Sequence, residues 1–378
     1  MEWVKLGEIT EVLDNRRVPL NNERRKEISE LKLFPYCGAN GVIDYIDEYI
    51  FNDDEEILCV AEDGGSWGYL QKCSYIMKEK CWVNNHAHVL KAKSNVNIKF
   101  LNYYLNFRDL NNHITGTTRG KLTQKEIKRI LIPKFKFENQ NVIVNTLNEL
   151  ENIIEIRKEQ IQAYDDLIES LFFEILNKSF IKEICFDDMF EIIDGDRGKN
   201  YPKKNDLLEE GYCLFLNTKN VTKNGFKFDQ LEFITEEKDK TLRKGRAKLG
   251  DFILTTRGTV GNIAFIDKEI EFKNIRINSG MVILRKKLEI NPKFFEVLIR
   301  KTDILVKAKS GSAQPQLPIK SLKKVLIPTI DVELQNKFAD YVLKIEEEKK
   351  KLNSSLLELE DLFDTLMEDA FSGNLFKE

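Results

Sequence analysis

The stretch KRILIPKFKFENQ at residues 128–140 returns, with small changes, as KKVLIPTIDVELQ at residues 323–335. Its two prolines, Pro133 and Pro328, are 195 positions apart. A phrase shared over this distance indicates that the chain carries one structural unit twice. In both copies a basic turn precedes a short apolar strand that we expect to end at the proline, because proline cannot donate to a β-ladder.

The repeat extends upstream of this phrase at nearly the same offset. Each copy holds a small-residue glycine loop, and further upstream a strand, a glycine turn and a return strand. The matching pairs are TGTTRGKLTQKEIKRILIP (115–133) with SGSAQPQLPIKSLKKVLIP (310–328), VNNHAHVLK (83–91) with INSGMVILR (277–285), and ILCVAEDGGSWG (57–68) with ILTTRGTVG (253–261). The loops between these anchors differ, which suggests one task performed on two different targets.

Downstream of each phrase the apolar residues change to a helical period. From about 138 to 177 there is no proline or glycine, and apolar residues alternate at spacings of four and three, which is the a/d seam of a coiled coil. The second copy keeps this pattern. The predicted seam residues are Leu147, Leu150, Ile161, Tyr164, Ile168 and Leu171 in the first helix, and Val342, Ile345, Leu356, Leu359, Phe363 and Leu366 in the second.

A single amphipathic helix of about 40 residues cannot bury its apolar stripe alone, whereas two equivalent helices in one chain can bury each other's. We therefore predict an α+β fold in which two globular α/β blocks are separated by two long helices forming an antiparallel coiled coil, as a pseudo-twofold internal repeat. The alternative is that each helix docks separately on its own block. The predicted segments are 1–137 (first block), 138–179 (first helix), 180–330 (second block) and 331–378 (second helix).

Charge is distributed unevenly over these segments. The chain of 378 residues has a net charge of −3, but residues 1–136 carry +2 and residues 181–330 carry +8. The helical segments 137–180 and 331–378 carry −6 and −7. Such a division is expected when different regions face different partners, with polyanions favouring the basic blocks.

Composition excludes several classes of protein. A hydrophobic content of 42% with 32% charged residues is typical of a globular chain, and no apolar run approaches the ~18 residues of a membrane span. The six cysteines contain no CxxC pair. They predict reduced, mostly buried thiols in a cytoplasmic protein without membrane association.

Motifs for catalysis or nucleotide binding are absent from the sequence. There is no [DNS]PP[YFW] run, no FxGxG or GxGxxG after a strand, and no GxxxxGK[ST]. His86 and His88 share one strand face and could chelate a metal, but the second copy has Gly280 and Val282 there. We therefore predict no metal, no cofactor and no catalytic residue in this chain, and interpret its acidic runs as solvated surface.

The duplicated order of these features resembles the specificity (S) subunits of type I restriction–modification systems. The residues that carry the resemblance are the loops Thr115-Gly116-Thr117 and Ser310-Gly311-Ser312, the phrases ILIP…ENQ and VLIP…ELQ entering the heptads, the helix IRKEQIQAYDDLIESLF (156–172) and the closing FSGNL (371–375). The resemblance covers essentially the whole chain. It implies two target-recognition domains on double-stranded DNA, with two methyltransferase (M) subunits docked on the helices and restriction (R) subunits as further partners.

The resemblance also implies that cofactors belong to the partners. Adenosylmethionine would be used by the M subunits for adenine-N6 methylation, and ATP and Mg²⁺ by an R subunit. This chain itself would be a non-catalytic subunit that reads a bipartite target. The rival interpretation is a coiled-coil scaffold whose paired domains bind protein, although a scaffold has no reason to make its globular blocks basic.

Reading DNA requires basic side chains for phosphates and Arg, Lys, Gln, Ser or Thr for base edges. Such residues cluster in the divergent loops, and Trp67 holds a turn where an aromatic ring could pack on a sugar or base. The predicted DNA-binding residues are Arg16, Arg17, Trp67, Thr117, Thr118, Arg119 and Lys121 in the first block, and Arg197, Lys199, Arg243, Arg257, Thr259, Ser312, Gln314 and Gln316 in the second.

Overall fold

The computed structural model describes residues 2–116, 118–311 and 315–376. The chain forms two compact units, one running to Lys158 and resuming at Ser354, and the other comprising Glu159–Asn353. The long helices are α5, Phe137–Lys178, and α10, Val332–Ser372. The first unit thus holds the first block with the start of α5 and the end of α10, and the second unit holds the second block with the remainder of each helix. The division into four segments made from the sequence stays a prediction.

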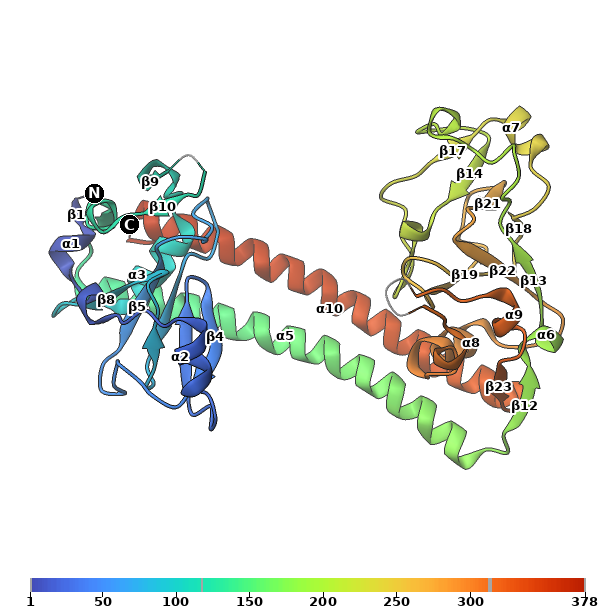
Figure 1. The fold of residues 1–378 in the computed structure, drawn as a ribbon, viewed down its shortest axis with the longest axis horizontal. Coiled ribbons are helices and arrows are strands. Elements are labelled where there is room, and N and C mark those ends of the chain that lie inside the picture. Colours follow the sequence, from blue (N-terminus) through green and yellow to red (C-terminus); the bar gives the residue numbers. More distant parts are fainter. Residues whose placement is uncertain (1, 117, 312–314, 377–378) are drawn as a thin grey trace. The chain divides into compact units, whose positions relative to one another are not determined.

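The first block contains two main sheets (Figure 1). One has the order β2-β8-β5-β6, and the other has the order β4-β3-β7 with β3 and β7 parallel. The strands are β2 (Thr10–Val12), β3 (Phe34–Gly38), β4 (Gly41–Ile46), β5 (Ile57–Ala61), β6 (Ser74–Met77), β7 (Trp82–Val83) and β8 (Ala87–Ala92). Helix α3, Ile98–Phe107, lies against β5 and β6. Short elements complete the block: α1 (Leu6–Ile9), α2 (Asn22–Glu27), β9 (Ile114–Thr115), β10 (Lys121–Leu122) and α4 (Gln124–Ile127).

The second block repeats this plan (Figure 1), with one more strand in its second sheet. Its sheets have the orders β13-β22-β19-β20 and β17-β14-β21-β18, with β14 and β21 parallel. The strands are β13 (Phe190–Asp194), β14 (Cys213–Leu216), β17 (Phe233–Ile234), β18 (Arg246–Ala247), β19 (Phe252–Thr255), β20 (Ile263–Phe265), β21 (Ile275–Ile277) and β22 (Met281–Lys286). The remaining elements include α6 (Phe186–Met189), the hairpin β15 (Val221–Thr222) and β16 (Gly225–Phe226), α7 (Glu236–Thr241), α8 (Pro292–Lys301) and α9 (Ile319–Leu322). The matching sheets confirm the predicted fold class and internal repeat.

A two-stranded ladder closes each block where the chain leaves for its long helix. In the first block β1 (Trp3–Lys5) pairs with β11 (Leu131–Pro133), and in the second β12 (Lys182–Cys185) pairs with β23 (Leu326–Thr329). Pro133 ends its strand as expected, but β23 continues one residue past Pro328. Because the first strand of each block returns to pair with the last, the block is tied together at the base of its helix.

A buried glutamine joins each block to its long helix in the same way in both copies. Gln140 is 6% exposed, and its Oε1 accepts from the backbone N–H of Asn97 at 2.9 Å while its Nε2 donates to the carbonyl of Phe135 at 3.0 Å. Asn97 is the N-cap of α3. One side chain therefore links the start of the block's helix, the exit from its last strand and the first turn of α5.

The second copy reproduces this glutamine contact. Gln335 is 1% exposed; its Oε1 accepts from the N–H of Asn291 at 2.9 Å, and its Nε2 donates to the carbonyl of Ile330 at 2.8 Å. Asn291 is the N-cap of α8. The following residues of the long helices, Asn141 and Asn336, each accept from the capping asparagine at 2.8 Å. This duplicated contact explains why the ENQ and ELQN phrases recur.

The long helices pack on each other and on the blocks. In the first unit the buried residues of the start of α5 share one core with the end of α10 and with α3, and Phe371 of α10 stacks near Phe100 and Tyr104 at ring distances of 5.6 and 5.2 Å. In the second unit Phe172 of α5 lies 5.7 Å from Phe338 of α10. The start of one helix thus meets the end of the other in each unit, so the pair is antiparallel.

The predicted seam residues differ in how deeply they are buried. Five of them are buried: Leu147, Leu150, Ile168, Val342 and Ile345. The others, Ile161, Tyr164, Leu171, Leu356, Leu359, Phe363 and Leu366, are half-buried. The heptad pattern did not single out Phe172, Met367 and Phe371, which are almost fully buried because they face the blocks as well as the opposite helix. The alternative of separately docked helices is therefore wrong, because each helix packs on the opposite helix as well as on a block.

Ion pairs also join the two helices, one of them at a polar break in the seam. Lys349, which interrupts the second heptad run, pairs with Asp165 of α5 within the second unit. Lys158 pairs with Glu360 of α10 at 3.1 Å within the first unit. Among the described residues, no helix is long and apolar enough to cross a membrane, and the six cysteines are free thiols.

We predict that Phe338→Ala will lower the free energy of unfolding by about 3–5 kcal/mol, because it opens a cavity beside Phe172 and Phe294. Tyr341→Ala on the same helix is the control, since Tyr341 is 59% exposed, and it should change stability by less than about 0.5 kcal/mol. Urea unfolding followed by far-UV circular dichroism measures both. Equal losses in the two variants would contradict the packing described for the second unit.

Candidate nucleic-acid interface

Each block carries one polar site where its four-stranded sheet ends. In the first block a single β-bridge joins Asp63, two residues beyond β5, to Lys121; in the second, Arg257, two residues beyond β19, is joined in the same way to Gln316. The neighbouring amides repeat the contact, with Leu122 N–H donating to Glu62 O at 2.8 Å and Leu317 N–H to Thr256 O at 2.9 Å. We call these two places the strand-end sites.

The ladder registers fix which residues of the two strand-end sites are equivalent. Val60 lies opposite His88 in the first block, and Leu254 lies opposite Val282 in the second. Counting along the strands from these pairs, the equivalent positions are Glu62 and Thr256, Asp63 and Arg257, His88 and Val282, and Lys121 and Gln316. An alignment of the two strands by their identical letters would instead match Ile57–Leu58 with Ile253–Leu254. That alignment is shifted by two residues from the one given by the ladder registers.

Two glycine turns hold each strand-end site in shape. The residue after the bridge is Gly64 with φ +69° in one block and Gly258 with φ +71° in the other. The loop before the bridging partner holds Gly116 with φ +97° and Gly311 with φ +85°. Residues other than glycine rarely adopt this left-handed backbone conformation. The two sites therefore share one backbone frame, although their side chains differ.

An Asp–Arg pair borders each site. Arg17 Nη2 lies 3.4 Å from Asp14 Oδ2 just after β2, and Arg197 Nη2 lies 3.0 Å from Asp194 Oδ1 at the end of β13. Both arginines also donate to a main-chain carbonyl beside the return strand, namely Ala87 O at 2.7 Å and Ser279 O at 3.2 Å. These two predicted DNA-binding residues are therefore equivalent in the structure.

The first strand-end site is filled by a buried ion-pair network. Glu62 Oε2 accepts from Arg17 at 2.7 Å, and Glu62 Oε1 from Lys121 at 2.8 Å. Burial alone would raise the pKa of Glu62, but its bonds to Lys121 and Arg17 hold the pKa below its ordinary value. Two predicted DNA-binding cations thus share one carboxylate.

His88 occupies the centre of this network and is 1% exposed. Its Nδ1 lies 2.6 Å from Asp14 Oδ2, and its Nε2 lies 2.7 Å from the carbonyl of Leu122. Burial would raise the pKa of Asp14, yet the His88 hydrogen bond and charge, the Val89 N–H and Arg17 lower it below its ordinary value.

Asp14, Glu62 and His88 have ligand atoms within 4.8 Å of one another, which is compatible with a metal site. Both oxygens of Glu62 already hold cations, however, and both His88 nitrogens already face oxygen atoms. A metal ion would have to displace Arg17 and Lys121. His86, the second histidine considered as a ligand, is bound to a different carboxylate, Asp63, at 2.7 Å.

The second strand-end site is open where the first is filled. Val282 and Thr256 replace His88 and Glu62, and a cavity of about 310 Å³ lies there. Arg257 and Gln316 are exposed, and within the described part of the chain their side chains have no hydrogen-bond or ion-pair partner. The residues that line the cavity are Asp194, Arg197, Thr256, Arg257, Gln316, Leu317, Pro318, Ile319 and Lys320.

The structure brings together only some of the predicted DNA-binding residues. Arg17, Arg119 and Lys121 meet at the first strand-end site, and Arg197, Arg257 and Gln316 at the second. Arg16 pairs with Glu55 at 2.7 Å and lies over the ring of Phe51. Thr118, Lys199, Arg243 and Thr259 are exposed on loops, and Thr117, Ser312 and Gln314 lie outside the described residues.

Trp67 is a correction to the sequence-based prediction. Its side chain is only 7% exposed, belongs to the core of the first block, and donates from Nε1 to the carbonyl of Ala61 at 3.2 Å. The ring therefore cannot stack on a base or sugar without unfolding this turn. Its place beside a glycine turn suggested exposure, but the turn folds the indole inward over Gly65 and Gly120.

Glu62 and Asp63, which organise the first site, are not among the residues predicted from the sequence. The acidic runs were interpreted as solvated surface, and the two strands were aligned by their identical letters. An alignment by the strand register would have placed Glu62 and Asp63 opposite Thr256 and Arg257. Lys320, which also lines the second site, lies on α9 and is likewise not among the residues predicted from the sequence.

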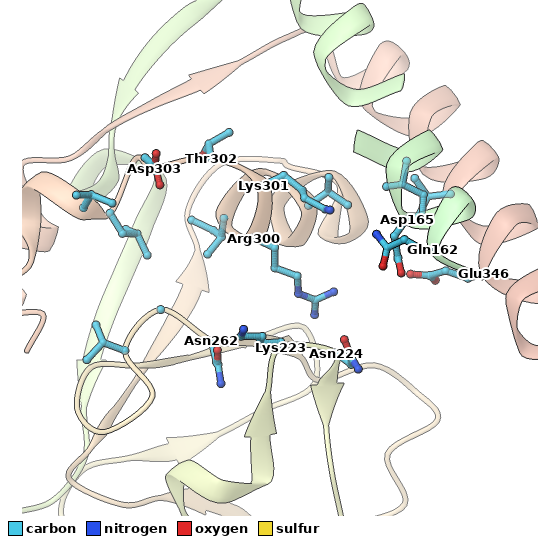
Figure 2. Close-up of a pocket in the computed structure, with 18 of the residues that line it drawn as sticks. Gln162, Asp165, Lys223, Asn224, Asn262, Arg300, Lys301, Thr302, Asp303 and Glu346 are labelled. Carbon is cyan, nitrogen blue, oxygen red and sulfur yellow. The ribbon is translucent and has the colours of Figure 1, made fainter. Parts of the chain in front are cut away.

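A larger cavity of about 780 Å³ lies in the second unit between its block and the long helices. Figure 2 shows Arg300 pointing into it from α8, toward Asn262 and Lys223, with Gln162, Asp165 and Glu346 on the helices. Arg300 pairs with Glu296 at 3.0 Å and donates to the carbonyl of Ile263 at 3.1 Å. Two further cations of the cavity wall, Lys301 and Lys349, pair with Glu169 and Asp165, so its charges are mostly satisfied within the protein.

Comparison with known proteins places these features in a family. The model of the type I restriction modification DNA specificity domain matches residues 1–163 and again residues 180–360. A putative type I restriction enzyme specificity subunit of Haemophilus influenzae (S.HindORF215P) is 26% identical over 289 residues, which is 71% of this chain and 69% of that protein.

Two solved structures share the fold. A type I restriction–modification system S subunit from M. genitalium has a TM-score of 0.56 at 17% identity, over 98% of this chain and 96% of that one. A structure from work on complex assembly and conformational transition of the type I R-M system has a TM-score of 0.59 at 14% identity, over 98% and 97%.

We predict that Asp14→Asn will destabilise the first unit by about 2–4 kcal/mol at pH 7, because buried His88 loses its charged acceptor. The pKa of Asp14 is lowered in the folded state from its ordinary value of 3.8. Its contribution is therefore present above that pH and is lost as the pH falls through the folded pKa. The difference between variant and parent should shrink below pH 3.8.

Urea unfolding followed by tryptophan fluorescence measures this effect, since Trp3, Trp67 and Trp82 all lie in the first block. Glu11→Gln, an exposed carboxylate on β2, serves as the control and should be neutral at every pH. A loss for Asp14→Asn that stays constant from pH 7 to pH 3 would contradict the ionised pair.

Proposed function

Because this chain belongs to the type I restriction modification DNA specificity domain family, we propose that it is the non-catalytic DNA specificity subunit of a type I restriction–modification complex. It reads a bipartite target in double-stranded DNA, one half with each block. The observation that carries this proposal is the duplicated strand-end site, where the same backbone frame presents different polar side chains. Two readers of one design with different surfaces are what a two-part asymmetric sequence requires.

The blocks and the long helices differ in charge, which supports different partners for the two. The second block carries +8 and exposes Arg257, Lys199 and Arg243 on its loops, which suits a phosphate backbone. The acidic long helices suit protein partners instead. Several large apolar side chains stay exposed on them, including Leu343 at 53%, Leu357 at 63% and Leu362 at 47%.

We assign this helical surface to methyltransferase partners, two of which would hold the complex over the target, one for each repeat. Adenine-N6 methylation with adenosylmethionine would take place in these partners, and ATP and Mg²⁺ would serve an additional restriction subunit. No step of that chemistry uses residues of this chain. Such a complex works on DNA in the cytoplasm, where free thiols stay reduced.

A protein-binding scaffold is the competing function, and DNA binding separates the two. We predict that the purified chain neither methylates nor cleaves DNA and binds duplex weakly at 0.15 M salt, because its net charge is −3. Adding the methyltransferase partner should produce sequence-specific binding, since the partner adds phosphate contacts. Methyl transfer by this chain alone, or partner binding without any DNA specificity, would refute the proposal.

The DNA sequence that the complex recognises can be identified by sequencing the methylome of a host with and without this chain. A duplex of that sequence then serves in binding measurements by fluorescence anisotropy, with a scrambled duplex and the partner alone as controls. We expect loss of one two-part methylated motif from the host that lacks the chain. Loss of a single uninterrupted motif would contradict reading by two separate blocks.

We further predict that Leu357→Asp will weaken binding of the methyltransferase partner at least about tenfold, because a carboxylate buried in an interface lacks a partner. Ser354→Asp adds the same charge at an exposed polar position of the same helix and should change the affinity less than about twofold. Analytical ultracentrifugation of mixtures measures both. Equal effects would show that added charge, not the apolar surface, governs docking.

A further inference from the structure

We propose that one bridging pair in each block decides the bases that it reads: Asp63 with Lys121 in the first, and Arg257 with Gln316 in the second. Specifically, Arg257 reads a guanine in one half-site, and Asp63 reads a cytosine in the other. This inference rests on the proposed DNA-reading function and identifies the residues that give it specificity.

The two pairs occupy the same place in the same frame. Each is joined by a single backbone bridge, is followed by a left-handed glycine and is bordered by an Asp–Arg pair. Between the first and the second block, the carboxylate of Asp63 is replaced by the guanidinium of Arg257, and the ammonium of Lys121 by the carboxamide of Gln316. A frame kept twice with such opposite chemistry is expected where the backbone has a common role and the side chains have different targets.

The bridge also determines which atoms remain for a ligand. It uses the main-chain groups of the paired residues, so the side chains provide the donors and acceptors that differ between blocks. In the second block the guanidinium of Arg257 and the carboxamide of Gln316 are exposed and have no partner among the described residues. Arginine pairs with the O6 and N7 atoms of guanine through two hydrogen bonds, and glutamine pairs similarly with adenine.

In the first block Asp63 is held ready to accept a hydrogen bond. Arg119 Nη2 and His86 Nδ1 approach the same oxygen, Oδ1, at 2.8 and 2.7 Å. The second oxygen, Oδ2, has no hydrogen-bond partner within the described chain, and the side chain is 17% exposed. A carboxylate oxygen fixed in this way accepts from the N4 amino group of cytosine, whereas it repels the acceptor edge of guanine.

Lys121 and Arg119 complete the first site as donors. Lys121 is about half exposed while it pairs with Glu62 at 2.8 Å, so its ammonium group has further N–H bonds to offer. Arg119 is 66% exposed and retains donors beyond its bond to Asp63. Both side chains suit phosphate or guanine oxygens near the cytosine that Asp63 reads.

The test uses the reconstituted complex with its methyltransferase partner and a plasmid library in which both half-sites are randomised. Sequencing of methylated products gives the base preference at every position. Arg257→Gln should reduce the preference for guanine about 10- to 100-fold at one base pair in one half-site, and leave the other half-site unchanged. Asp63→Asn should do the same for cytosine in the other half-site, with adenine gaining, because a carboxamide pairs with adenine.

Arg243→Gln is the matched control, since it removes the same charge from an exposed loop of the same block. It should weaken methylation evenly at all sequences without altering any base preference. An even loss for Arg257→Gln as well, or changes in both half-sites, would overturn the proposal. Unfolding midpoints of Arg257→Gln and Arg243→Gln should match the parent, because the bridges are made by backbone atoms. Asp63→Asn keeps the bridge but weakens the contacts with Arg119 and His86, so its methylation is compared at a temperature well below its own unfolding midpoint.

The outcomes separate this inference from the function on which it rests. A parent complex without sequence preference would refute the function itself. A specific parent complex whose motif survives Arg257→Gln and Asp63→Asn intact would refute only the bridging-pair assignment. If Arg257→Gln abolishes methylation, Arg257→Lys keeps the charge but loses the planar fork, and an unchanged guanine preference in that variant would likewise overturn the assignment.

Discussion

The contact on which the rest of this structure depends is the buried carboxamide at the start of each long helix. The side chains of Gln140 and Gln335 each accept a hydrogen bond from the backbone N–H of the residue that caps the block's helix. Each also donates one to a backbone carbonyl just after the block's last strand. A buried amide without partners costs several kcal/mol, so these two bonds restrict the block to one orientation on its helix. Because both copies make the same bonds at 2.8–3.0 Å, each block is presented on its helix in the same way.

This restraint lets the loops diverge without loss of the frame. The strands, the bridge and the left-handed glycines are shared by the two blocks, whereas the side chains at the strand ends are not. In the first block a histidine and a glutamate fill the site, and in the second a valine and a threonine leave it open. The two blocks are therefore alike where backbone hydrogen bonds define the fold, and their chemistry differs where only side chains are involved.

The fold followed from the sequence because its signals are periodic and occur twice. Leu147, Leu150, Val342 and Ile345 were found by heptad spacing, and the prolines and glutamines by their common offset. The strand-end sites could be predicted only in part. Arg257, Gln316 and Lys121 follow from residue type and loop position. Spacing gives no sign that Trp67 turns inward, or that Glu62 joins Arg17 and Lys121, because these contacts connect segments distant in the chain.

The two strand-end sites also differ in how much charge they leave for a polyanion. In the first block Arg17, Lys121 and Arg119 each pair with a carboxylate, so a phosphate must compete with Glu62 or Asp63 for them. In the second block Arg197 is paired with Asp194, but Arg257 forms no ion pair with a carboxylate among the described residues. An ion pair that must open before DNA binds offsets part of the gain from phosphate contact. On the proposed DNA-reading function, the first block would depend more on the geometry of its polar groups, and the second more on attraction to the DNA phosphate backbone. The same frame would then support two different balances of specificity and affinity.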